Sequence, residues 1–223
     1  MDRDQIETAL AHLRDRIASA AVRSGRHPED IVLVAVTKGV DADRIRAAIA
    51  AGITDLGENR VQEAALKIEA IGRRAVHWHL VGHLQRNKVR EAVGLFDVIH
   101  SVDRVRLAAD LSRLASMPIE ILLQVNVSGE RQKSGFSPDD LPSAIRQIAA
   151  LPGLNVTGLM TIAPMMDDPE TVRPIFRRLR DLRDRLNALG IPGLQLRYLS
   201  MGMSDDFEVA VEEGATIVRI GRA

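Results

Sequence analysis

The chain has 223 residues, of which 46% are hydrophobic, and this length suits one large core or two small ones. Thirty basic and thirty acidic side chains cancel to a formal charge of zero, which argues against binding of nucleic acid or of an anionic membrane surface. Cysteine is absent and no apolar stretch approaches the roughly twenty residues that cross a bilayer, so the sequence excludes disulfides and thiol catalysis and predicts a cytoplasmic protein.

The first periodic segment is an amphipathic helix that places Ile6, Leu10, Leu13 and Ile17 on one face and ends near Gly25. Strand-like and helix-like segments then alternate along the chain. Strands are predicted near residues 31–37, 53–56, 76–81, 97–100, 119–126, 154–161, 194–199 and 216–220. Helices are predicted at about 42–51, 59–70, 86–93, 103–115, 138–150, 170–189 and 205–213, and the arginines of 177–185, interleaved with aspartates, predict a solvated helix face.

Alternation of this kind predicts parallel strands joined by right-handed crossovers, and eight strands can close into a (β/α)8 TIM-like barrel. An open doubly wound sheet is the alternative. Gly-x-Gly-x-x-Gly is missing after the first strand and no linker-like stretch divides the chain, so we favour a single barrel domain over residues 1–223. No helix follows the last predicted strand, and we expect the additional N-terminal helix to cover that side of the barrel.

The first predicted strand ends in Lys38, which Gly39 follows at once. The carboxyl end of a barrel strand is where reactive groups are presented, and a lysine partly desolvated by apolar neighbours can attack a carbonyl to form a Schiff base. Taken alone, a lysine that extends its amine into water explains the position more simply. The chemical interpretation depends on other segments that meet Lys38.

Side-chain alternation predicts which residues enter the barrel. His77, His79 and Val81 share one face of the third strand. Ile217 and Arg219 share a face of the last strand, which places a guanidinium inside the barrel. A buried arginine is costly without a partner, so we expect Arg219 to meet a carboxylate or a ligand.

The seventh strand continues into Ser200-Met201-Gly202-Met203-Ser204, whose glycine and small hydroxyls can present backbone N–H groups to an anion. Barrels often hold phosphate in the loops after strands seven and eight. Helix capping by Ser204 or Asp205 is an equally good local explanation. The last segment adds Gly221 and Arg222 beside the same loop. A lysine, an arginine and an anion-binding loop around one opening suit an aldehyde that carries a phosphate, such as pyridoxal 5′-phosphate (PLP).

Several motifs occur in an order that resembles the pyridoxal phosphate homeostasis protein family, whose fold is like the N-terminal barrel of alanine racemase. The resemblance spans nearly the whole chain. The motifs are Ala35-Val36-Thr37-Lys38, Gly57-Glu58-Asn59, the block from Trp78 to Lys88, Lys133-Ser134-Gly135, Gly158-Leu159-Met160-Thr161, the block from Leu199 to Asp206 and Val218-Arg219-Ile220-Gly221.

The resemblance implies a role for each of these residues toward the cofactor. Lys38 would carry the cofactor imine, and Arg219 would approach the pyridine nitrogen. The phosphate would be surrounded by Ser200, the backbone of Met201 and Gly202, Gly221 and Arg222. The ring would be lined by Asn59, His79 and Met160.

Two features depart from the family pattern. Members usually continue past the equivalent of Ala223 with a short Ile-Phe-Gly segment, so we expect a truncated chain with a less enclosed phosphate site. Leu80 stands where Phe or Met is more usual, a packing change without chemical consequence.

A PLP protein of this kind can be a carrier or an enzyme. Arginine keeps its proton and leaves the pyridine ring a weak electron sink, and the one tyrosine, Tyr198, is predicted inside the barrel rather than over the cofactor. We therefore expect a non-catalytic protein of vitamin B6 and amino-acid homeostasis, with PLP-dependent apo-enzymes as acceptors and no metal. The alternatives are a weak amino-acid racemase that uses Lys38 with His79 or water as the second base, or a Schiff-base aldolase on a phosphorylated sugar. Lys133 is expected to be a solvated loop lysine.

Overall fold

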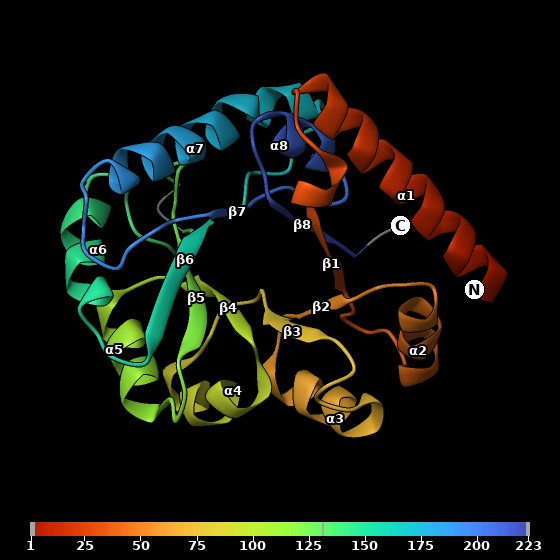
Figure 1. The fold of residues 1–223 in the computed structure, drawn as a ribbon, viewed down its shortest axis with the longest axis horizontal. Coiled ribbons are helices and arrows are strands. Elements are labelled where there is room, and N and C mark those ends of the chain that lie inside the picture. The colour runs from red at the N-terminus through yellow and green to blue at the C-terminus, as the bar shows by residue number, and fades with distance from the viewer. Residues whose placement is uncertain (1–2, 131, 222–223) are drawn as a thin grey trace.

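The computed structural model describes residues 3–130 and 132–221, and its strands form a closed parallel barrel in the order β1 to β8. The ring of strands with helices around it is visible in Figure 1. The strands are β1 (Val32–Val36), β2 (Asp55–Glu58), β3 (His77–Leu80), β4 (Val98–Val102), β5 (Ile119–Gln124), β6 (Leu154–Met160), β7 (Tyr198–Ser200) and β8 (Ile217–Ile220). Val34 of β1 pairs with Asp55 on one side and Arg219 on the other, which closes the barrel.

Helices follow the strands in the predicted order. The α-helices are α1 (Arg3–Arg23), α2 (Ala42–Ala50), α3 (Val61–Ile71), α4 (Val89–Leu95), α5 (Val105–Leu114), α6 (Leu141–Ala149), α7 (Arg173–Asn187) and α8 (Phe207–Glu212), with short 3-10 helices η1 (Pro28–Asp30), η2 (Arg86–Lys88) and η3 (Pro169–Val172). No described helix combines the length and the apolar character that crossing a membrane requires.

Helix α1 lies along the side of the barrel beside β1 and β8, where it packs on α8 and α2 (Figure 1). Arg16 and Arg23 of α1 form ion pairs with Glu208 and Glu212 of α8, at 3.0 and 2.8 Å between nitrogen and oxygen. The expectation that the N-terminal helix covers this side is confirmed.

The second and seventh strands differ from the prediction. Strand β2 begins at Asp55 and extends to Glu58, beyond the predicted end, because the buried Glu58 side chain is paired with Lys67 and its backbone continues the register opposite Leu80. Strand β7 starts only at Tyr198, since the preceding residues form a turn and a loop without strand pairing. The polar Glu58 made the predicted second strand end too early, and the apolar residues before Tyr198 made the predicted seventh strand begin too early.

The barrel interior is a small apolar cluster distinct from the core between barrel and helices. Its fully or largely buried members are Val34, Val81, Leu122, Met160 and Ile217. Trp78 and Leu80 belong instead to the outer core, which confirms the predicted alternation in β3.

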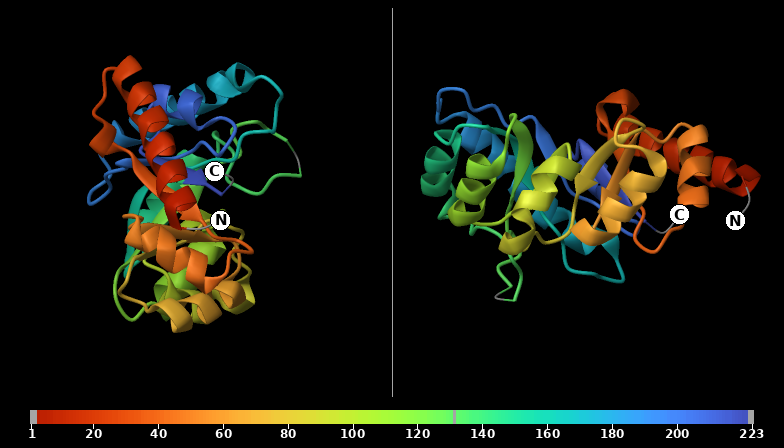
Figure 2. Two further views of the ribbon diagram at one scale, coloured as in Figure 1. Left: turned by 90° about the vertical axis from the view of Figure 1, so that its right-hand side faces the viewer. Right: turned by 90° about the horizontal axis from the view of Figure 1, so that it is seen from below.

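The loops after β5 and β6 protrude on the same side of the barrel, as both views of Figure 2 show. This side carries the carboxyl ends of all eight parallel strands. It is the face on which barrels place their ligand sites, and we call it the mouth.

Candidate functional site

A cavity of about 350 Å³ opens at the mouth, and its size suits a small organic ligand. Its polar wall comes from the ends of β2 and β8 and from the loop after β7. Its apolar wall comes mainly from the loop after β6, which contributes Ile162, Pro164, Met165 and Met166. A flat ligand with one apolar face and charged ends would match these two walls.

Arg219 lies in the floor of the mouth cavity, and its side chain is almost completely buried. Nη1 donates a hydrogen bond to Ser200 Oγ at 2.6 Å, and Nη2 donates to the Thr161 carbonyl at 2.9 Å. Burial lowers the Arg219 pKa to about 10, against the opposing charge of Asp206, so the guanidinium stays protonated at neutral pH. Among the described residues no carboxylate hydrogen-bonds it, and it has five N–H groups, so donors remain for a ligand.

The loops after β7 and β8 meet beside Arg219. Met203, Ser204, Asp205 and Asp206 line the cavity together with Gly221. The Met203 N–H donates to Asp206 Oδ1 at 2.6 Å, and the Gly221 N–H donates to Ser204 Oγ at 3.4 Å. Burial raises the Asp206 pKa, although the hydrogen bond from Met203 and the Arg219 charge oppose it. The predicted juxtaposition of these two loops is present.

Gly202 is required by the shape of this loop. Its φ is +93°, and a Cβ built there would lie 2.6 Å from Ala210 Cβ and 3.0 Å from Phe207 Cα. Only glycine brings the backbone this close to α8 in this conformation. Gly82 is equally constrained, because a Cβ would lie 2.2 Å from the carbonyl oxygen of Asn59, whose residue also lines the cavity.

Lys38 lies in the turn that follows β1, at the rim of the mouth, and its side chain is exposed. The expectation that apolar neighbours desolvate this amine is corrected here, because β1 ends at Val36 and residue 38 has already left the strand. The backbone before Lys38 is firmly held. Lys67 Nζ donates to the Thr37 carbonyl at 2.5 Å and to Glu58 Oε1 at 2.6 Å, and the Thr37 hydroxyl donates to the same carboxylate.

Three residues expected at the cofactor lie deeper, inside the barrel. His79, Met160 and Ser200 are buried, and the mouth cavity does not touch them. His79 lies one layer below Val81 in the barrel interior. Side-chain alternation predicts which face of a strand a residue occupies, but it does not predict how deep in the barrel the ligand site reaches. Met201 packs in the outer core, and Arg222 lies outside the described residues.

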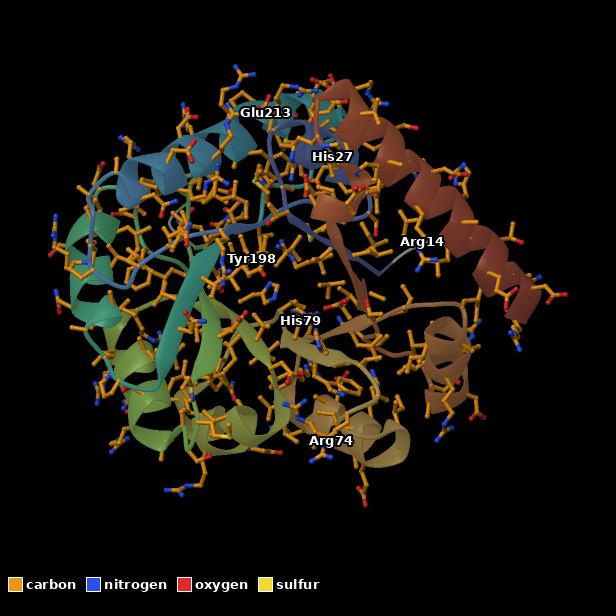
Figure 3. All side chains as sticks on the ribbon, viewed as in Figure 1. Arg14, His27, Arg74, His79, Tyr198 and Glu213 are labelled. Atoms are coloured by element: carbon orange, nitrogen blue, oxygen red, sulfur yellow. The ribbon has the colours of Figure 1, made fainter. Side chains whose placement is uncertain are left out.

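The buried polar residues inside the barrel form a continuous chain. His79 Nε2 lies 2.9 Å from Asp55 Oδ1, His79 Nδ1 lies 2.9 Å from His100 Nε2, and His100 Nδ1 lies 2.9 Å from Ser200 Oγ. Figure 3 shows His79 within the ring of strands. His100 was not predicted to take part, although a single histidine within the apolar β4 segment is a signal for a buried polar contact.

Tyr198 and Lys133 do not line the mouth cavity. Tyr198 packs against the interior cluster and lines a separate cavity at the opposite end of the barrel with Asp55, His77 and Glu120. Lys133 Nζ lies 2.6 Å from Glu130 Oε1 and lines a neighbouring hollow beside the mouth cavity.

Comparisons with known proteins agree with this geometry. The family model "Alanine racemase, N-terminal domain" matches residues 8–223. Pyridoxal phosphate homeostasis proteins of Aquifex aeolicus and Pseudomonas aeruginosa are each 44% identical, over 95% and 96% of this chain and 93% and 92% of theirs. The structure of PipY from Synechococcus elongatus with PLP bound superposes with a TM-score of 0.80 at 40% identity, covering 93% of this chain and 97% of that one.

Proposed function

Because the chain belongs to the pyridoxal phosphate homeostasis protein family, we propose that it binds PLP at the mouth of the barrel and takes part in intracellular PLP and amino-acid homeostasis. The observation that carries this proposal is the meeting of Arg219, the loop after Gly202 and Gly221 in one cavity, on the side of the barrel where β1 ends and Lys38 follows it. The bound cofactor supplies an aldehyde that condenses reversibly with amines.

The residues present fit this cofactor. Lys38 Nζ would attack the aldehyde carbon to form a C=N bond, and the aldehyde oxygen would leave as water. Arg219 would donate to the pyridine nitrogen, and Asn59 would line the ring. Gly202 lets the loop after β7 pack closely against α8, and the next residues of that loop, Met203 and Ser204, line the cavity where the phosphate would lie. Gly221 would contribute from the end of β8.

We assign the protein a role in holding and transferring PLP rather than in catalysis. We also propose that residues 1–223 form a single barrel domain and that the protein acts in the cytoplasm. PLP-dependent apo-enzymes are the proposed acceptors. Two features support release of PLP to an acceptor, because both leave the mouth accessible from outside. The Lys38 side chain is exposed, and Met165 and Met166 in the apolar loop after β6 have 78% and 49% of their surface accessible. A racemase that used His79 as its second base gains no support, because His79 is buried and both ring nitrogens are already engaged.

The test is to load the protein with PLP, reduce it with borohydride and locate the modified peptide by mass spectrometry. We expect one modified site at Lys38, and loss of both the visible absorbance and the modification in Lys38→Ala. Lys133→Ala is the matched control, since this second lysine near the mouth lies against Glu130 and outside the cavity. A label that stays in Lys38→Ala, or a halved stoichiometry in Lys133→Ala, would contradict the assignment.

A further inference from the structure

A line of hydrogen-bonded side chains crosses the barrel interior from β2 to β8 and ends on Arg219. It runs through Asp55, His79, His100 and Ser200, at 2.9, 2.9, 2.9 and 2.6 Å between successive donor and acceptor atoms. His79, His100 and Ser200 are buried beside the apolar interior cluster, and Asp55 and His79 also line the cavity at the end of the barrel opposite the mouth. We call this line the relay.

The two ends of the relay force its direction. A guanidinium only donates, so Ser200 Oγ accepts from Arg219. The hydroxyl proton of Ser200 then has His100 Nδ1 as its acceptor, which places the His100 proton on Nε2. That proton is donated to His79 Nδ1, so the His79 proton lies on Nε2 and is donated to the Asp55 carboxylate, which only accepts.

Any added proton breaks this pattern. With a proton on both nitrogens of His79, His100 Nε2 would have to accept and His100 Nδ1 would donate to Ser200, whose hydroxyl proton would lose its acceptor. Burial, with the Arg219 charge acting in the same direction, lowers the His100 pKa well below its ordinary value and so favours the neutral ring. At the other end burial of Asp55 is outweighed by hydrogen bonds from His79 and Thr54, which lower its pKa and keep the carboxylate ionised.

We propose that His100 is a positioning residue for Arg219, and that His79 and Asp55 act behind it by fixing its tautomer. The inference rests on the proposed function, in which Arg219 contacts the pyridine nitrogen of the cofactor. It assigns Ser200 a new role. Its hydroxyl proton is directed into the barrel and its oxygen accepts from Arg219, so Ser200 orients the guanidinium and does not donate to the phosphate.

The first experiment needs no cofactor. Nitrogen-15 NMR of the histidine side chains at neutral pH reports which ring nitrogen carries the proton. We expect neutral rings protonated on Nε2 for both His79 and His100, and a shift of the His79 signals in His100→Leu. A His100 ring protonated on Nδ1, or charged at neutral pH, overturns the proposal even if PLP binds normally.

The second experiment measures affinity for PLP and for pyridoxal, which lacks the phosphate. Loss of the acceptor leaves the Ser200 hydroxyl unpaired and the guanidinium loosely held, so we expect His100→Leu to weaken both ligands by about tenfold. His100→Asn, whose side-chain oxygen can replace Nδ1 as the acceptor, should stay within about threefold of the parent protein. Ser101→Ala is the matched control, because its buried hydroxyl lies on the same strand and has no hydrogen-bond partner in the described structure.

Ser200→Ala separates the relay from a phosphate contact and is a smaller change than His100→Leu. If Ser200 orients Arg219, this variant weakens PLP and pyridoxal by the same factor. A loss confined to PLP, or unchanged binding in both Ser200→Ala and His100→Leu, refutes the positioning role. Failure of the parent protein to bind PLP at all would instead refute the proposed function, and the tautomer measurement would still stand on its own.

Discussion

Gly202 shows how one residue shapes the anion-binding loop. Its left-handed backbone and its contact with α8 leave no room for a side chain, so Gly202→Ala must strain the backbone and push Ala210 away. We expect a loss of about 1–3 kcal/mol in the free energy of unfolding and at least a tenfold weaker affinity for PLP. Gly94→Ala is the control, because this glycine lies in helix α4 with no atom near its Cβ position. Chemical denaturation and absorbance titration measure both effects, and unchanged PLP binding in Gly202→Ala would count against a phosphate at this loop.

The place of an individual residue was predictable where its position in a strand determines which way its side chain points. Arg219 was predicted inside the barrel because it alternates with Ile217 on the last strand, and this placement is confirmed. The depth of His79 and the contribution of His100 were not predictable, because they depend on which interior layer meets the ligand and on partners from four other strands. The Lys38 side chain also differs from the expectation, since it lies two residues past the end of β1 and is exposed.

Helices α7 and α8 are joined by a cluster that the sequence pattern did not reveal. The arginines of residues 177–185 were expected to be solvated, yet Arg177 and Arg180 donate to the buried carboxylate of Glu213 at 2.9 and 3.1 Å, and Arg173 at the start of α7 joins them at 3.3 Å. Glu213 is labelled beside α8 in Figure 3. Periodicity identified the helix but could not identify a partner that lies more than thirty residues further along the chain.

This cluster predicts a pH dependence of stability. Burial alone would raise the Glu213 pKa, but the hydrogen bonds from Arg177 and Arg173 outweigh burial and lower it. A lowered pKa in the folded state stabilises the fold above the unfolded value of 4.5, and this stabilisation is lost as the pH falls through the folded value. Glu213→Gln should therefore lose about 1–3 kcal/mol at pH 7, and urea unfolding at about pH 3 should show a much smaller difference. An equal difference at both pH values would exclude this origin.

For the whole molecule, the alternation of strands and helices was enough to predict the barrel, because parallel strands with helical crossovers have few ways to close. Closure also determines which end of each strand faces the ligand. It places the cavity with Arg219 at one end and the cavity with Tyr198 at the other, and the sequence could predict the first end but not the second cavity.

The distance between Tyr198 at one end of the barrel and the mouth cavity at the other is the reason why we expect a non-catalytic protein. Exchange of an amino acid's Cα proton by a two-base site needs a second proton-transfer group near the cofactor, and the one tyrosine of the chain lies at the far end. We therefore expect the PLP-loaded protein, incubated with L-alanine in deuterated water, to incorporate no more Cα deuterium than the same concentration of free PLP. Proton NMR of the amino acid measures this directly. Faster incorporation that disappears in Lys38→Ala would show that Lys38 or solvent suffices as the base at this mouth, and the carrier assignment would then fall in favour of a weak racemase.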